Sequence, residues 1–165
     1  MAPKAPEGAL SSQLLGVSCR SAAACVAVGL YLNHNGNGVP LAETWNGRTW
    51  TTHTVTQSAS QKFDASLTGV ACPSAKSCLA VGQVNLTVND GGHTGRAAAT
   101  RWNGKSWSAT TVPGPGKGRA SLFTEVSCPA AADWVAVGQA GPFNSDEGSP
   151  LAGFWNTRVW TLATP

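Results

Sequence analysis

The side chains that could bind a ligand gather in three polar segments of the sequence. Each segment holds amide, carboxylate or imidazole groups, which form hydrogen bonds with the hydroxyl groups of sugars and other small polar molecules. An aromatic residue begins the first segment and another begins the third, where each could stack on a sugar ring. The candidate ligand-binding residues are Tyr31, Asn33, His34 and Asn35 in the first segment, Asn89, Asp90, His93 and Arg96 in the second, and Phe143, Asn144, Asp146 and Glu147 in the third.

The same segments supply the candidates for catalysis. His34 or His93 could act as a general base, and Asp90, Asp146 or Glu147 could assist as a carboxylate. Acid–base catalysis needs such groups within hydrogen-bonding distance, and no pair has a spacing that predicts this. The chain also has no HExxH, GxSxG or phosphate-binding glycine motif. We therefore predict a non-catalytic role and assign no catalytic residue, no cofactor and no metal.

The composition indicates a chain built from β-strands. Charged residues make up only 12% of the sequence, and 19 glycines and 10 prolines are typical of short strands joined by tight turns. No stretch has the apolar spacing of an amphipathic helix. The 11 Lys and Arg residues are scattered singly, which predicts no nucleic-acid partner. No apolar run approaches the roughly 18 residues that span a membrane, so no membrane partner is predicted either.

Three copies of one unit account for most of the chain. Their first cysteines, Cys19, Cys72 and Cys128, are 53 and 56 residues apart, a period typical of closed β repeats. Each copy ends in a pair of tryptophans separated by four residues. The aligned segments are LLGVSCRSAAACVAVG (14–29) with WNGRTW (45–50), LTGVACPSAKSCLAVG (67–82) with WNGKSW (102–107), and FTEVSCPAAADWVAVG (123–138) with WNTRVW (155–160).

The chain is predicted to be a single repeat domain, 1–165, in which each copy forms four strands. The first strand ends at the first cysteine, the Ala-Val-Gly motif ends the second, and the two tryptophans mark the third and fourth. Asn46-Gly47 and Asn103-Gly104 suit the positive φ angles of the tight turn between the tryptophans, and Asn156-Thr157 suits them less well. Repeats 1, 2 and 3 are placed at about 14–55, 67–112 and 123–163.

The pattern VSCPSxxxCxAVG followed by WNGxxW resembles the β-propeller repeats of secreted bacterial proteins. The resemblance extends over nearly the whole chain, from Leu14 to Trp160. It implies four-stranded blades arranged around a central channel. It does not imply one activity, because propellers include lectins, hydrolases, lyases and scaffolds.

The paired cysteines predict two disulfides. Cys19 and Cys25 are six residues apart, as are Cys72 and Cys78, so each pair could staple the first two strands of its repeat. Zinc is the alternative, but a tetrahedral site needs clustered ligands, and these pairs lie in separate repeats without matching histidines. Two disulfides predict an oxidising compartment and therefore a secreted protein.

Two further observations concern the cysteines and the compartment. In repeat 3, Trp134 stands at the position of the second cysteine, so Cys128 is interpreted as the retained half of a lost staple. The residues before Leu10 lack the apolar stretch of a signal peptide, which leaves a cytoplasmic protein as the alternative.

Three blades are too few to close a propeller, which uses about four to eight. Two chains related by a twofold axis would supply the missing blades and cover the exposed faces at both ends of the arc. We therefore predict three four-stranded blades per chain that complete a six-bladed β-propeller as a homodimer. A β-trefoil, which closes three four-stranded repeats within one chain, is the alternative fold. A fragment of a longer propeller is a further alternative.

The connections between repeats, and those between second and third strands, come out on one face of a propeller. Here they are long and differ between repeats, and such loops commonly carry function. We predict a non-catalytic, lectin-like module that binds a carbohydrate or small polar ligand through these loops. One alternative is an enzyme, a hydrolase, lyase or cyclase, with its site at the channel mouth. The other is a structural or protein-interaction scaffold.

Overall fold

The computed structural model describes residues 2–55, 64–87, 93–130, 133–142 and 147–163 of the chain. Within these ranges all regular secondary structure is β-strand, which confirms the all-β prediction. The strands form three separate four-stranded antiparallel sheets, one in each repeat. They are β1 Ser11–Ser21, β2 Ala24–Leu32, β3 Gly38–Trp45 and β4 Trp50–Thr54 in sheet 1; β5 Ala65–Ser74, β6 Ser77–Thr87, β7 His93–Trp102 and β8 Trp107–Thr110 in sheet 2; and β9 Arg119–Ala130, β10 Asp133–Pro142, β11 Ser149–Trp155 and β12 Trp160–Ala163 in sheet 3.

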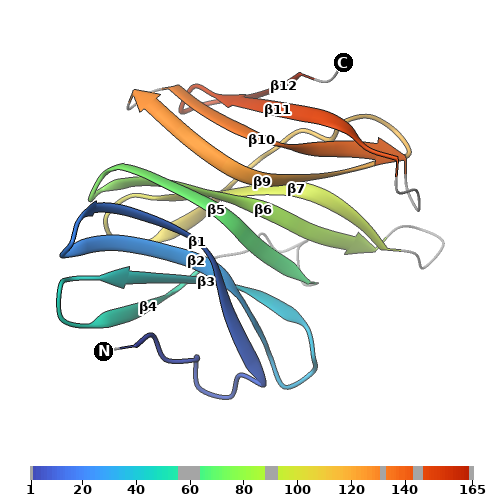
Figure 1. Cartoon of the computed structure of the whole chain (residues 1–165). Coiled ribbons are helices and arrows are strands. Elements are labelled where there is room, and N and C mark those ends of the chain that lie inside the picture. Colours follow the sequence, from blue (N-terminus) through green and yellow to red (C-terminus); the bar gives the residue numbers. More distant parts are fainter. Residues whose placement is uncertain (1, 56–63, 88–92, 131–132, 143–146, 164–165) are drawn as a thin grey trace.

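Each sheet is a simple meander, in which strands that follow one another in sequence are also neighbours in the sheet. Figure 1 shows the three sheets stacked face to face in chain order, with sheet 2 in the middle. β5 contacts β1, β2 and β3 of sheet 1, and β9 contacts β5, β6 and β7 of sheet 2. The first strand of each sheet therefore lies against the sheet that precedes it. We call the two packed interfaces junction 1–2 and junction 2–3.

The hydrophobic core lies in these two junctions. In junction 1–2, Val28 of sheet 1 packs in one buried cluster with Val70 and Trp107 of sheet 2. In junction 2–3, Val81 of sheet 2 packs in the same way with Val126 and Trp160 of sheet 3. Each junction thus joins a valine-rich face of one sheet to the tryptophan-bearing face of the next.

The tryptophan pair forms a similar hairpin in all three repeats. The paired indole rings have centroids 5.4 Å apart in repeat 1 and 5.6 Å apart in repeats 2 and 3. The asparagine that follows the first tryptophan accepts two backbone N–H groups through its Oδ1, in every repeat. Gly47 and Gly104 have φ angles of 89° and 94°, and Thr157 has 72° at the same position. The third turn therefore forms although its residue suits a positive φ poorly.

The predicted disulfides are confirmed. Cys19 bonds to Cys25 and Cys72 to Cys78, each across the first two strands of its sheet. In repeat 3, Trp134 is buried at the equivalent position, and Cys128 is half-buried against the same core cluster. No helix among the described residues is long and apolar enough to cross a membrane.

A glycine ends the Ala-Val-Gly motif of each repeat because the backbone of the neighbouring first strand comes very close to it, at a register shift between the two strands. A Cβ atom at this position would overlap a carbonyl oxygen of the first strand. The same contact occurs in all three sheets, which also defines equivalent positions in their first strands. The glycine and the carbonyl are Gly29 and Gln13 in sheet 1, Gly82 and Ser66 in sheet 2, and Gly138 and Leu122 in sheet 3.

A second series of positions sets the distance between successive sheets. A Cβ added to Gly16 would lie 2.7 Å from the carbonyl oxygen of Thr68, and one added to Gly69 would lie 2.8 Å from the Cα of Glu125. Glycine at these positions lets β1 approach β5, and lets β5 approach β9, backbone to backbone. Glu125 occupies the third position of the series, on the sheet that no later sheet covers in this chain.

Candidate functional site

Two grooves of similar composition open between successive sheets, at the end of the sheets opposite the disulfides. Groove 1–2 encloses about 270 Å³ between sheets 1 and 2, and groove 2–3 encloses about 200 Å³ between sheets 2 and 3. The lining of groove 1–2 includes Leu30, Leu32, Gly38, Asp64, Gln83 and Asn85. The lining of groove 2–3 includes Gln83, Gly95, Ser121, Gln139, Glu147 and Gly148.

The strand register shows that the two grooves occupy equivalent places in the repeat. Gly38 pairs with Leu32 across β2 and β3, and Gly95 pairs with Asn85 across β6 and β7. Gln83 and Gln139 each directly follow the glycine that ends the Ala-Val-Gly motif. The same architectural position therefore forms a groove at both junctions.

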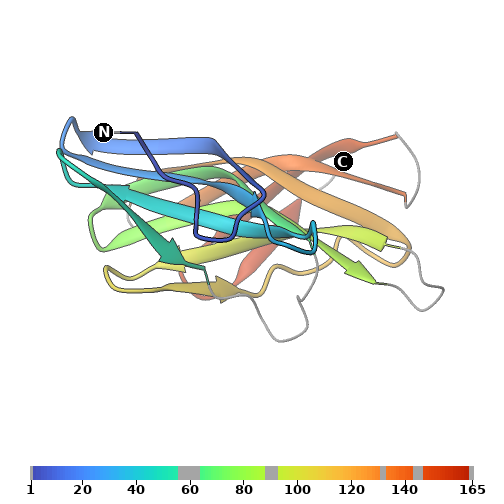
Figure 2. The same ribbon diagram turned by 90° about the horizontal axis from the view of Figure 1, so that it is seen from below.

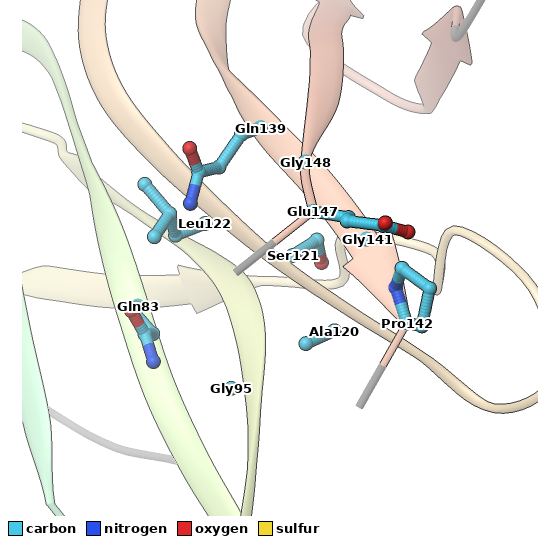
Figure 3. Close-up of a pocket in the computed structure, with 10 residues that line it drawn as sticks. All are labelled: Gln83, Gly95, Ala120, Ser121, Leu122, Gln139, Gly141, Pro142, Glu147 and Gly148. Carbon is cyan, nitrogen blue, oxygen red and sulfur yellow. The ribbon is translucent and has the colours of Figure 1, made fainter. Parts of the chain in front are cut away.

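Amide side chains and small residues dominate the lining. Figure 3 shows Gln83 beside Gly95 on one side of groove 2–3, with Gln139, Ser121 and Glu147 across from them. In groove 1–2, Gln83 Nε2 donates to Asn85 Oδ1 at 2.9 Å. No aromatic side chain of the described residues lines either groove. Groove 2–3 is therefore mainly polar, groove 1–2 combines amide groups with the apolar side chains of Leu30 and Leu32, and neither has an aromatic stacking platform.

Hydrogen bonds beside each groove tie the two sheets together. The Gly38 backbone N–H donates to Asp64 Oδ1 at 2.5 Å, which links sheet 1 to the start of sheet 2. The Ala97 backbone N–H donates to Ser121 Oγ at 3.0 Å, which links sheet 2 to sheet 3. Since these bonds cross the junctions, they hold the width of each groove.

The first of the predicted polar segments lies beside groove 1–2. Asn33 Oδ1 accepts the backbone N–H groups of Asn35 and Asn37 at 2.9 and 3.1 Å, so this side chain holds its own turn. His34 and Asn35 are exposed at the tip of that turn. Tyr31 alternates along β2 with the groove residues on either side of it, so its side chain lies on the opposite face of the strand.

Among the other predicted residues, Glu147 is the one that the structure brings into a groove. It is exposed and lines groove 2–3. The guanidinium of Arg96 lies against Gly114, in the segment between β8 and β9. His93 begins β7. The predicted residues Asn89, Asp90, Phe143, Asn144 and Asp146 lie outside the described residues.

Sequence analysis missed the residues that define both grooves. Gln83, Gln139 and Asp64 stand at or next to strand positions, whereas the prediction considered the loops. A signal for the two glutamines was present, because AVGQ occurs at 80–83 and again at 136–139. A polar residue repeated directly after a required glycine marks a position that each repeat presents in the same way.

Among the described residues, Glu43 and His53 have pKa values shifted by burial, and both lie outside the grooves, in sheet 1. Glu43 is 1% exposed, its Oε2 has no hydrogen-bond partner, and burial raises the pKa of its carboxyl group. His53 bonds Thr44 Oγ1 at 2.8 Å, and burial lowers the pKa of its imidazole. Glu43 pairs with Thr52, the residue before His53, so Glu43 and His53 point to opposite faces of the sheet. They cannot act as an acid–base pair.

The tryptophan side chains pack in the core or hold turns, and none lines a groove. Trp102, Trp107, Trp155 and Trp160 are buried, and their equivalents in repeat 1 are half-buried. The indole N–H groups of Trp45 and Trp102 donate to the carbonyl oxygens of Ala22 and Ala75, which holds the turn between the first two strands. Among the described residues, no group of three or more His, Cys, Asp or Glu side chains is arranged to hold a metal ion.

No family model matches the sequence, and no curated protein matches it. Among solved structures, the chain is similar to a sucrose-6-phosphate hydrolase from Lactobacillus gasseri, with a TM-score of 0.61 and 10% identity. That match covers 94% of this chain and 34% of the hydrolase, so the chain spans about a third of that protein's length. A fucose lectin from Kordia zhangzhouensis, solved with methyl-fucoside, matches with a TM-score of 0.48 and 12% identity, over 90% of this chain and 97% of the lectin. The first match concerns the fold alone, and the second is too distant to carry an argument.

Proposed function

We propose that this protein is a non-catalytic, lectin-like module that binds a carbohydrate or another small polar ligand in the grooves between its sheets. The observation that carries the proposal is the recurrence of an amide-bearing groove at the same position of both junctions. Amide groups donate and accept hydrogen bonds at once, which suits a ligand with several hydroxyl groups. Volumes of about 200 and 270 Å³ fit a single sugar unit better than a drug-sized molecule, which needs about 300 to 1,000 Å³.

The distribution of carboxylates supports binding rather than hydrolysis. Glycoside hydrolysis generally uses two carboxylates, about 5 to 9.5 Å apart. Among the described residues, groove 1–2 contains Asp64 and groove 2–3 contains Glu147, one carboxylate each. Shallow sites of this kind bind weakly one at a time, and several on one molecule add avidity for a repeated ligand.

We also propose that the three sheets are propeller blades and that a second copy of the chain completes the ring. Each repeat is a separate meander, and successive sheets stack face to face. A trefoil would instead require strands of different repeats to join in one barrel. The two disulfides indicate an oxidising environment, which supports a secreted protein.

The substitution Gln83→Leu tests the binding proposal, because Gln83 lines both grooves. Leu30 stands at the equivalent position of repeat 1, so the fold already accepts leucine there. The probes are the methyl glycosides of glucose, galactose, mannose and fucose, measured by saturation-transfer NMR and titration calorimetry. We expect the wild type to bind at least one with a Kd of about 1 mM, and the variant to bind it about tenfold more weakly.

Ser108→Leu is the matched control, because Ser108 is exposed on β8 and lines neither groove. This variant should bind as the wild type does. Absence of saturable binding to all four glycosides, or equal binding by wild type and Gln83→Leu, would contradict the proposal. Cleavage of a glycoside would replace it with the enzyme alternative.

A further inference from the structure

The outer face of sheet 3 carries residues whose equivalents in repeats 1 and 2 are buried in the internal junctions. Val28 and Val81 are 0% exposed, because each faces the sheet that follows its own. Val137 occupies the same position of repeat 3, directly before the glycine of the Ala-Val-Gly motif, and is 48% exposed. Phe154, on the neighbouring strand of the same face, is 47% exposed. Sheet 3 thus presents the first half of a junction without the second half.

The outer face of sheet 1 presents the missing half. Val70 and Val126 are each 5% exposed, because each faces the preceding sheet. Val17 holds the same position of repeat 1 and is 64% exposed. The tryptophan pair Trp45 and Trp50 is half-buried on this sheet, whereas its equivalents in the other two sheets are buried. Figure 1 shows that these two faces lie at opposite ends of the stack.

A hollow on sheet 3 also indicates that its outer face is one half of a junction. Between sheets 1 and 2, at the disulfide end, a pocket of about 150 Å³ is lined on one side by Cys25, Val26 and Trp45. The equivalent residues of repeat 3 are Trp134, Val135 and Trp155, and they line an open hollow of about 230 Å³ on the outer face. The second wall, which Cys72, Cys78 and Trp102 provide in the pocket between sheets 1 and 2, is missing there.

We propose that the outer face of sheet 3 docks on the outer face of sheet 1 of a second copy, so that two copies close a ring head to tail. The proposal rests on the blade architecture inferred above. Two identical junctions form at once in such a dimer, each a variant of the internal junctions. Closed rings of this kind have about four to eight blades. One copy supplies three sheets, so two copies are the count that falls within that range.

Closure also creates a composite groove at each of the two junctions between copies, which neither copy contains alone. Gln139 and Gly148 of sheet 3 would form one side, as Gln83 and Gly95 do in groove 2–3. Gln13 and Leu30 of the second copy would form the other side, because they hold the positions of Ser66 and Gln83 in groove 1–2. This composite groove has the same amide-rich chemistry and would take the same class of ligand, a small molecule with several hydroxyl groups.

The junction between copies differs from the internal ones at one position. Glu125 stands where Gly16 and Gly69 allow close backbone approach inside the chain. Its side chain holds β9 farther from β1 of the second copy than β5 lies from β9. The junction between copies is therefore the looser one, and its association is reversible.

The substitutions Val137→Asp and Val17→Lys test the junction from its two sides. Both residues are exposed in the single chain, so we expect both variants to fold, as far-UV circular dichroism would show. Wild type should have a mass of twice 16.9 kDa by light scattering, and each variant should have the mass of one chain. Phe154→Ser, on the same face as Val137, should weaken the dimer at least tenfold and serves as a second variant. Ser108→Asp adds a charge on exposed β8 and should leave the dimer intact.

Mixing the Val137→Asp and Val17→Lys variants tests the head-to-tail geometry. In a mixed pair, one junction brings the introduced carboxylate against the introduced ammonium group and the other junction is wild type, so the dimer should re-form. Any of three results would overturn the inference. They are a monomeric wild type, single variants Val137→Asp, Val17→Lys and Phe154→Ser that all remain dimers, and a mixture that stays monomeric. Sugar binding is read separately, because monomeric Val137→Asp keeps grooves 1–2 and 2–3. A dimer that binds no sugar would contradict the proposed function and leave the junction standing.

Discussion

Thr157 illustrates how a repeat can keep its geometry after losing the residue that suits it. Its φ of 72° is the only positive φ of a non-glycine residue among the described residues, and Asn156 holds the turn with the same two hydrogen bonds as its equivalents. A β-branched residue in this region costs about 1 to 3 kcal/mol. The surrounding hairpin therefore imposes the turn against the preference of its residue.

We expect Thr157→Gly to stabilise the protein by about 1 kcal/mol, since relief of strain exceeds the entropy that glycine adds to the unfolded chain. The measurement is the free energy of unfolding by urea titration. Gly104→Thr, at the equivalent position of repeat 2, should lower it by a similar amount. If both substitutions were neutral, the turn would not be strained.

Glu43 makes stability depend on pH in an unusual direction for a carboxylate. Burial raises its pKa above the ordinary value of 4.5, so the folded state holds the proton more tightly than the unfolded state does. Ionisation then opposes folding. The penalty is absent below about pH 4.5 and grows as the pH rises through the folded-state pKa.

Glu43→Gln should accordingly unfold at a higher urea concentration than wild type at about pH 7, and at the same concentration at about pH 4. Glu7→Gln, at an exposed position, is the control and should change neither value. A Glu43→Gln variant that gained as much at acid pH as at neutral pH would show that the effect comes from shape rather than from charge.

At the residue scale, the sequence identified one groove residue and missed others for a physical reason. Glu147 was predicted because it is an acidic residue in a connection that differs between the repeats. Gln83 and Gln139 lie within β6 and β10, and only the packing of one sheet on the next makes these strand positions line a groove. Asn33 is polar and in a loop, yet its side chain is used by its own turn. Composition alone does not distinguish a residue that lines a groove from one whose side chain bonds its own turn.

At the scale of elements, the repeat carried most of the information. The tryptophan pairs and the Asn-Gly turns predicted the hairpins, and the cysteine spacing predicted the staples that are observed. The exact strand lengths were not predictable, because β9 and β5 continue beyond the aligned motifs into segments with no repeated pattern. There the pairing with β10 and β6 determines where the strand begins.

Gly82→Ala tests the close approach of the first strand to the second at this register shift. The added Cβ would overlap the Ser66 carbonyl oxygen, and overpacking of this kind costs about 1 to 3 kcal/mol. We expect a loss of about 2 kcal/mol in the free energy of unfolding. Gly148→Ala is a suitable control, because its Cβ would meet only the flexible Gln139 side chain at 3.4 Å. Equal stability of the two variants would show that this close backbone contact can relax.

At the scale of the whole molecule, the sequence predicted three repeats, and the structure adds which of their faces are exposed. The number of repeats could be counted from the cysteines and tryptophans. The exposed faces could not be predicted from the sequence, because Val28, Val81 and Val137 occupy the same position of the same motif. Only the stacking order makes the third of them exposed.

Figures 1 and 2 show that β2, β6 and β10 end on the same side of the stack. The residues that line both grooves lie toward this side, while both disulfides join the opposite ends of their strands. Ligands held there would all be approached from one side. If two copies close the proposed ring and its grooves bind sugars, the ring would bind a polysaccharide layer through one face and engage several chains together. It would be poorly suited to cross-linking two such layers, because its opposite face offers stapled turns in place of grooves.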